Sequence, residues 1–233
     1  MPYPYPLLDL PPGNWKNIYE FQSIHMAAAH NTFIQSINAI AKHAPNVTED
    51  KIQPFMIFAL TAISTVHHHH NLEETFLFPF YEEKLGKGAL QVNIEQHEMF
   101  IPQLNELENY LKEVQDGKAK YDGKLIFDKI ESFGDIMVDH LRNEIATLEP
   151  ERLRANFTEK ELKQMDTDLT NMILSALDHY KNLPSVMVTM DPRTPWFPAF
   201  PLPIKWATRL WYSRKYKEAW EFGPVDLYGN PRK

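Results

Sequence analysis

Proline is distributed very unevenly along this sequence, and that distribution limits where long helices can form. Five of the 18 prolines lie in the first twelve residues and eight lie from Pro184 onward, so the long stretch between them holds only five. Proline lacks a backbone N–H and clashes with the preceding turn, which ends or kinks a helix. Long helices are therefore expected in the middle of the chain, between two largely irregular ends.

Apolar residues recur with a 3.6-residue period in five segments of this middle stretch, and no strand pattern competes with them. The predicted helices span residues 16–43, 54–84, 89–115, 122–148 and 158–181. Turn-forming residues separate these segments, and Thr158 with Glu161 forms a capping box at the start of the fifth. Short connections leave consecutive helices little choice but to lie side by side. The sequence thus predicts an all-α fold built on an up-down-up-down four-helix bundle.

Four regions follow from this pattern. They are an irregular N-terminal arm (1–15), the four-helix bundle (16–150), an additional helix packed on the bundle (151–182) and a Pro- and Trp-rich C-terminal tail (183–233). The tail carries several basic residues and no acidic residue between Asp191 and Glu218, and one short helix is expected near residues 205–220. Its aromatic residues are expected to pack over the bundle. The alternative is contact with a membrane surface or a protein partner, which basic amphipathic segments can supply.

Composition excludes several classes of protein. Hydrophobic residues make up 43% and charged residues 24%, as in an ordinary globular protein. The absence of cysteine excludes disulfides, cysteine-based zinc sites and iron–sulfur clusters, so any metal must be bound by nitrogen and oxygen. A net charge of -7 argues against a nucleic-acid partner. No apolar run is long enough to cross a bilayer and no secretory signal pattern begins the sequence, so a cytoplasmic location is expected.

Histidine interrupts the apolar face of every predicted bundle helix. On the second helix the inward series steps by four and three through Phe55, Ala59, Ala62, Val66, His69, Glu73, Phe76 and Phe80. The fourth helix repeats the pattern through Ile130, Phe133, Met137, His140 and Glu144. The first and third helices each add one inward histidine, His30 and His97. Because a buried polar group needs a partner, four core histidines on four helices point to a shared ligand.

Four imidazoles and two carboxylates suit a transition-metal centre. These donors bind iron, manganese, zinc or copper, and a glutamate can bridge two ions. Six protein ligands are too many for one tetrahedral zinc and suit a pair of iron ions with open positions. The Glu-x-x-His spacing of ferritin-type di-iron bundles is absent, as is the zincin His-Glu-x-x-His motif. Two metal ions held by His and Glu are therefore predicted.

Four motifs together resemble the hemerythrin-like family, also called the HHE cation-binding domain, over residues 20–150. They are His30-Asn31, the string HHNLEETFLFP at residues 69–79, Glu95-Gln96-His97-Glu98, and His140-Leu141-Arg142-Asn143-Glu144. The long aromatic tail is similar to that of fungal members. The resemblance implies a non-haem di-iron site with an oxo or hydroxo bridge, with manganese or zinc as substitutes. Its implied ligands are His30, His69, Glu73, His97, His140 and Glu144, with the two glutamates as bridges.

The sequence departs from the oxygen-carrying members at two positions. Ile101 stands where carriers have a second third-helix histidine, and Glu144 follows His140 by four residues where carriers have an aspartate after five. A missing imidazole opens a coordination position, which favours reactivity over reversible O2 carriage. Whether His70 or Glu74 also ligates is left open. Metal-bound imidazoles need support from neighbouring groups, and Asp139, Glu98 and Tyr81 are candidates by proximity.

Three functions remain open at this point, and no catalytic residue is assigned. The first is a di-iron protein that binds or reacts with O2, peroxide or iron. The second is a di-iron oxygenase or oxidase acting on a small organic substrate, with a pocket beside the metals roofed by Trp196, Phe197, Trp206 and Trp211. The third is an iron- or oxygen-responsive regulatory module. His25, His43 and His179 are expected not to ligate, with His43 and His179 at the surface.

Overall fold

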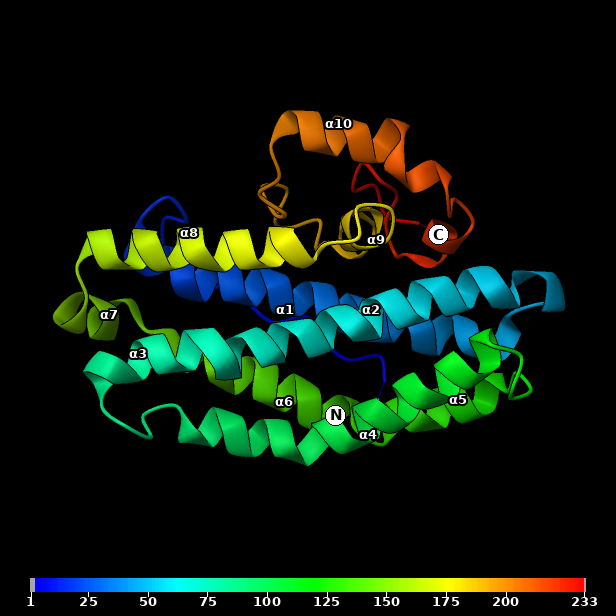
Figure 1. The fold of residues 1–233 in the computed structure, drawn as a ribbon, viewed down its shortest axis with the longest axis horizontal. Coiled ribbons are helices and arrows are strands. Elements are labelled where there is room, and N and C mark those ends of the chain that lie inside the picture. Colours follow the sequence, from blue (N-terminus) through cyan, green and yellow to red (C-terminus); the bar gives the residue numbers. More distant parts are fainter. Residues whose placement is uncertain (1–2, 233) are drawn as a thin grey trace.

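A computed structural model describes residues 3–232 of the chain. Every regular element in this range is helical, and the β structure found there is one isolated bridge between Val225 and Pro231. Figure 1 shows long helices packed side by side, with shorter C-terminal helices covering one face. The prediction of an all-α protein is confirmed.

Four helical walls form the bundle. They are α1 (Ile18–His43), α2 (Ile52–Leu72) continued by a π-helical turn (Glu73–Leu77) and α3 (Phe78–Leu85), then α4 (Gln91–Gln115), and finally α5 (Gly123–Glu131) with α6 (Gly134–Ile145). Short connections join consecutive walls, which therefore run in opposite directions (Figure 1). Contacts of α1 with α2, α2 with α4, α4 with α6 and α6 with α1 close the ring around one interior.

Two walls that the sequence predicts as continuous are interrupted. The second widens into the π-helical turn, after which Pro79 lies in the first turn of α3, where its missing N–H is tolerated. The helix therefore continues to Leu85 and ends at Gly86, with φ +95°. The fourth wall breaks just before Gly134, at which a Cβ atom would lie 2.3 Å from the Tyr5 ring. The close approach of the N-terminal arm thus requires glycine at the break.

The connection between α3 and α4 sets the height of His97. Residue counts from the turn place His69 and His97 at different levels, which would separate them along the bundle axis. In Figure 1 the segment 86–90 runs back along the bundle before α4 begins at Gln91. The start of α4 is therefore shifted toward the middle of α2, which brings His97 beside His70 and Glu73.

Shorter helices follow the bundle. They are α7 (Pro150–Asn156), α8 (Glu159–Ala176), α9 (Asn182–Thr189) and α10 (Leu202–Leu210). The predicted capping box begins α8, which packs against α1 and ends five residues earlier than the predicted 181. The tail differs from its prediction, because it holds two helices and α10 lies upstream of most of the segment 205–220. α9 packs on α1 and α2, and α10 packs on α9.

A buried polar network ties the arm and the tail to α1. Asn31 accepts a hydrogen bond from Leu8 N (2.7 Å) and donates to Leu8 O and to Asp191 Oδ2. Arg193 pairs with Asp191 and also donates to Leu8 O (2.9 Å). Both ends of the chain therefore pack against α1 one residue from His30. Within residues 3–232, no helix is long and apolar enough to span a membrane.

Candidate metal centre

A polar layer crosses the bundle between two clusters of buried apolar side chains. On α1, His30 lies between Met26 of one cluster and Phe33 of the other. The other three walls repeat this arrangement, with apolar residues above and below each inward histidine or glutamate. His30, His97, His140, Glu73 and Glu144 are all buried. The layer is thus shielded from water by apolar packing on both sides.

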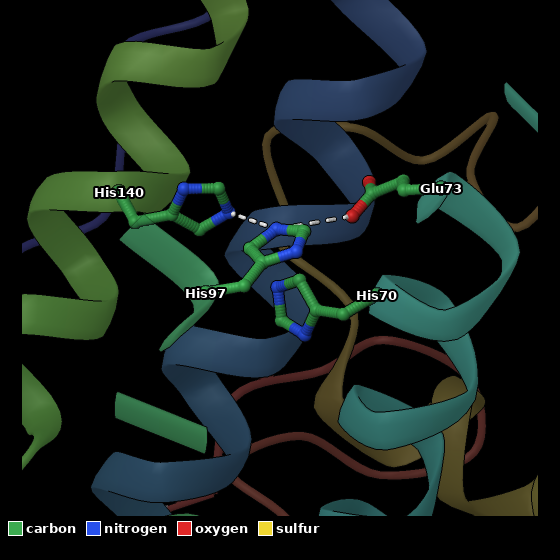
Figure 2. A group of neighbouring side chains, drawn as sticks. All are labelled: His70, Glu73, His97 and His140. Carbon is green, nitrogen blue, oxygen red and sulfur yellow. Dashed lines mark hydrogen bonds and ion pairs between the residues drawn. The ribbon is translucent and has the colours of Figure 1, made fainter. Parts of the chain in front are cut away.

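The ligand atoms of this layer fall into two groups, in each of which they lie within 4.8 Å of one another. The His30 group consists of His30, His69, Glu73 and Glu144, and the His70 group consists of His70, Glu73, His97 and His140. Figure 2 shows the side chains of the second group converging from α2, α4, α6 and the π-helical turn. All six residues singled out from the sequence are brought together, and His70 joins them.

His70 is the residue that the helical periodicity left out of the inward series. That series contains His69, yet His70 is 2% exposed while the His69 side chain is 18% exposed. At about 100° per residue, His69 and His70 flank Glu73 on either side of the same helix face. The centre of the stripe therefore runs between the two histidines. The HHxxE spacing was the available signal, and the adjoining π-helical turn is a common feature of functional sites.

Three imidazoles are held by hydrogen bonds at Nδ1. His30 donates to Leu141 O (2.8 Å), His97 to Glu74 Oε1 (2.6 Å) and His140 to Gln96 Oε1 (3.1 Å). Carbonyl and carboxylate oxygens only accept, so the proton of each neutral ring lies on Nδ1. Nε2 is then an unprotonated nitrogen directed into the layer. This is the arrangement usually found around histidines that bind metal.

The groups that support the imidazoles differ from those expected. Asp139 instead pairs with Arg142, Tyr81 donates to Gln22, and Glu98 is exposed. Glu74 and Gln96, which each neighbour a layer residue in sequence, take the supporting positions. Their roles depend on how α2, α4 and α6 face one another. The periodicity of a single helix carries no information about its neighbours.

The layer fits a pair of cations better than it fits no cation. His97 Nε2 lies 3.0 Å from His140 Nε2, and His30 Nε2 lies 3.2 Å from His69 Nε2. With both Nδ1 atoms of the first pair donating outward, two lone pairs face each other. Among the described residues, both ring nitrogens of His70 and both oxygens of Glu73 and of Glu144 are also buried without a hydrogen bond, and the two glutamates have only ion-pair contacts with imidazoles of the layer. Each such group costs about 1–3 kcal/mol, which a bound cation would offset.

Burial and mutual contacts shift the protonation of these groups. Burial, together with neighbouring imidazoles, holds the pKa of His69 and His70 well below the ordinary value and lowers that of His140 to about 3. Burial and the nearby Glu144 carboxylate raise the pKa of Glu73. Burial alone would raise the pKa of Glu144, but the adjacent imidazoles, led by His30, lower it to about 2. The imidazoles of His69, His70 and His140 are therefore neutral near pH 7 and able to bind a metal.

The donor count revises the expectation drawn from Ile101. The His70 group offers three imidazoles and the His30 group offers two, because His70 on α2 supplies the ring that α4 lacks at position 101. Glu74 is 42% exposed and engaged by His97, so it is not part of either group. The donor group with fewer imidazoles is therefore the one that contains His30 and His69, and not the one that contains His97.

The other histidines lie outside both groups. His67 faces Glu108 at 3.5 Å, and His179 is exposed, as expected. His43 was expected at the surface, but it is half-buried and packs edge-on against Phe222 of the tail. His25 is half-buried and stacks on Phe21, with ring centroids 4.7 Å apart. Burial lowers the pKa of His25 to about 4.

Comparison with known proteins agrees with the geometry of the layer. Residues 24–151 match the Hemerythrin HHE cation binding domain, and the chain belongs to this family. The protein is therefore a cation-binding four-helix-bundle protein. It is also 27% identical over 239 residues to the fungal "Dimeric xanthone biosynthesis cluster protein R11" of Cryptosporiopsis sp. (strain 8999), an alignment covering 98% of this chain and 89% of the relative. The similarity thus includes the C-terminal tail. No solved structure matches the chain.

Proposed function

We propose that this chain is a non-haem di-iron protein that binds or reacts with O2 or peroxide. The observation that carries the proposal is the pairing of two donor groups through one shared carboxylate, Glu73. A donor set of imidazoles and carboxylates suits iron, and more donors converge here than one tetrahedral ion can use. Manganese or zinc could bind to the same groups.

The carboxylates are placed to span two ions. Glu73 Oε1 lies 2.6 Å from His69 Nε2, and its Oε2 lies 3.7 Å from His97 Nε2. Glu144 Oε2 lies 3.4 Å from His30 Nε2 and 3.7 Å from His140 Nε2. Each glutamate therefore reaches imidazoles of both groups. His70, His97 and His140 would hold one ion and His30 and His69 the other, and Glu73 and Glu144 would supply carboxylate oxygens to the layer.

The protein contributes orientation and exclusion of water. Nδ1 contacts to Leu141, Glu74 and Gln96 fix three rings, and the apolar clusters on either side keep bulk solvent from the layer. Iron, when bound, supplies the redox chemistry that O2 or peroxide requires. Because the His30 group has one imidazole fewer, its side of the layer is where a small oxidant would have room to bind.

Anaerobic reconstitution with Fe(II), followed by exposure to air, tests the proposal. We expect two irons per chain by elemental analysis and a new near-ultraviolet or visible charge-transfer band when O2 is admitted. Reconstitution with Zn(II) is the control, because zinc fills the donors without redox chemistry. A stoichiometry of one iron or none, or the absence of any O2-dependent band at two irons per chain, would contradict the proposal.

A second candidate function is favoured by one feature beside the layer. A cavity of about 200 Å³ reaches His69 and Glu73, so an organic molecule could lie against the His30 group. The relative from Cryptosporiopsis is named for a biosynthesis cluster. An oxygenase or oxidase acting on a small organic substrate is therefore the alternative. It predicts that an organic substrate increases O2 consumption. In a protein that only binds or reduces the oxidant, O2 consumption would not depend on such a substrate.

A further inference from the structure

The cavity beside the His30 group lies between α1, α2, α8 and α9. Its walls come from side chains of these helices and from Phe197 of the tail. We expected four tail aromatics to roof such a pocket, but only Phe197 of the four lines it. Trp206 and Trp211 are instead 59% and 65% exposed. The roof is provided by α8, through Leu169, Thr170 and Ile173.

Aromatic rings form a substantial part of the cavity wall. Phe21, His25, Phe33 and Phe197 line it together with His69. Ring centroids are 5.2 Å apart between His25 and Phe197 and 4.8 Å apart between Phe33 and His69. Such walls favour a flat ring, which can stack on or meet the edges of its neighbours, over a flexible aliphatic chain.

The volume limits the occupant to a small molecule. An apolar cavity of about 150 Å³ in a protein interior can bind benzene. The present cavity of about 200 Å³ is slightly larger, so it has room for one six-membered ring with one or two small substituents.

Polar groups on the wall specify the substituent. His68 lines the cavity, and its Nε2 atom is buried without a hydrogen-bond partner among the described residues. Asp166 also lines it, from α8, and is half-buried. A hydroxyl group both donates and accepts hydrogen bonds, so one such group can satisfy an imidazole nitrogen or a carboxylate. An aromatic hydrocarbon would leave both wall groups without that partner.

We propose that this cavity is a binding site for a single-ring phenol, held between the aromatic side chains of α1 and the side chains of α8, with its ring adjacent to His69 and Glu73. The inference deepens the proposed function, because a phenol held there would lie beside the His30 group. Occupancy of the cavity does not itself require iron. The two proposals can therefore fail separately.

Titration calorimetry with 4-methylphenol on the iron-loaded chain tests the site, and elemental analysis gives the iron content of the same sample. We expect one phenol per chain, with weaker binding of toluene, which lacks the hydroxyl, and of 4-methylcyclohexanol, which lacks the flat ring. Equal affinity for all three compounds would refute the assignment. Two irons without phenol binding would also refute it, whereas phenol binding without iron would refute only the di-iron proposal.

A matched pair of variants locates the phenol. Thr170 and Asn171 are consecutive exposed residues of α8, but only Thr170 lines the cavity. Filling the cavity with Thr170→Phe should weaken phenol binding roughly tenfold or more, whereas Asn171→Phe should leave it unchanged. Iron content should stay the same in both variants, since neither position contacts the layer. Equal losses of phenol affinity in the two variants, or none in Thr170→Phe, would place the phenol elsewhere.

Discussion

The buried histidines of the layer direct at least one ring nitrogen into the layer. His30, His97 and His140 donate through Nδ1, while both ring nitrogens of His70 lack partners among the described residues. A fold that buries such groups without compensation loses stability. Metal binding therefore explains why these polar residues are buried, whereas a purely structural role does not.

Glu73 and His70 should differ in what their loss removes. Glu73 belongs to both donor groups and His70 to one. We expect Glu73→Ala to abolish iron binding, and His70→Ala to reduce it from two ions toward one, as measured by elemental analysis after reconstitution. His67→Ala is the control, because His67 pairs with Glu108 outside the layer. Full iron content in His70→Ala would show that His70 is a structural residue.

Glu74 should tune the centre without binding metal. Its carboxylate accepts the Nδ1 proton of His97 at 2.6 Å and thereby orients that ring. Removing such support typically weakens metal affinity about 10–100-fold. We expect Glu74→Gln to lower iron affinity within this range and to shift the charge-transfer band, measured by competition with a chelator and by absorption. Glu98→Gln, at an exposed site on α4, should change neither.

His25 should make stability depend on acidity. Burial lowers its pKa from 6.5 to about 4, so between these values the unfolded chain binds a proton that the folded chain does not. Stability is therefore expected to fall as pH decreases from 6.5 to 4. In His25→Phe, which keeps a ring against Phe21 and Phe197, this fall should be smaller. Urea unfolding at pH 7 and pH 5 measures both. An identical fall in the variant would contradict the assignment.

At the scale of elements, helical periodicity was sufficient to predict the four helical walls of the bundle. It was insufficient to predict where those helices are interrupted. Steps of four and three identified His30, His69, His97 and His140 because straight helices keep one face inward. The π-helical turn at Glu73 and the break at Gly134 depend on neighbouring segments, such as Tyr5, that no local pattern reveals. In the tail, α9 was missed and α10 was predicted a few residues too far along the chain, for a related reason. Their formation relies on packing against the bundle in a segment rich in proline.

α10 presents an apolar stripe to solvent and should bind anionic membranes. Leu202, Trp206, Leu210 and the adjacent Trp211 are each about 60% exposed, and basic residues follow at Arg214 and Lys215. Tryptophan with neighbouring cations suits the interface of an anionic bilayer. We expect cosedimentation with vesicles containing phosphatidylserine, reduced by salt and by Trp206→Ser. No binding at low salt, or equal binding to neutral vesicles, would contradict this expectation.

At the scale of the whole molecule, the centre depends on more than the bundle. The matched family region covers residues 24–151, yet the cavity roof comes from α8 and Phe197, and Asn31 is satisfied by Leu8 and Asp191 from the two ends of the chain. The alignment with the Cryptosporiopsis protein extends across these same outer parts. The arm, the bundle and the tail therefore form one cooperative unit around α1.

The buried polar network around Asn31 limits how the protein can be shortened for experiments. A fragment trimmed to the family boundaries would lose the Leu8 and Asp191 segments that hydrogen-bond to Asn31, and would expose this side of α1, next to His30, to water. Such a fragment should be less soluble and slower to take up iron than the intact chain. A truncated fragment would therefore misrepresent the metal-binding layer of the intact chain.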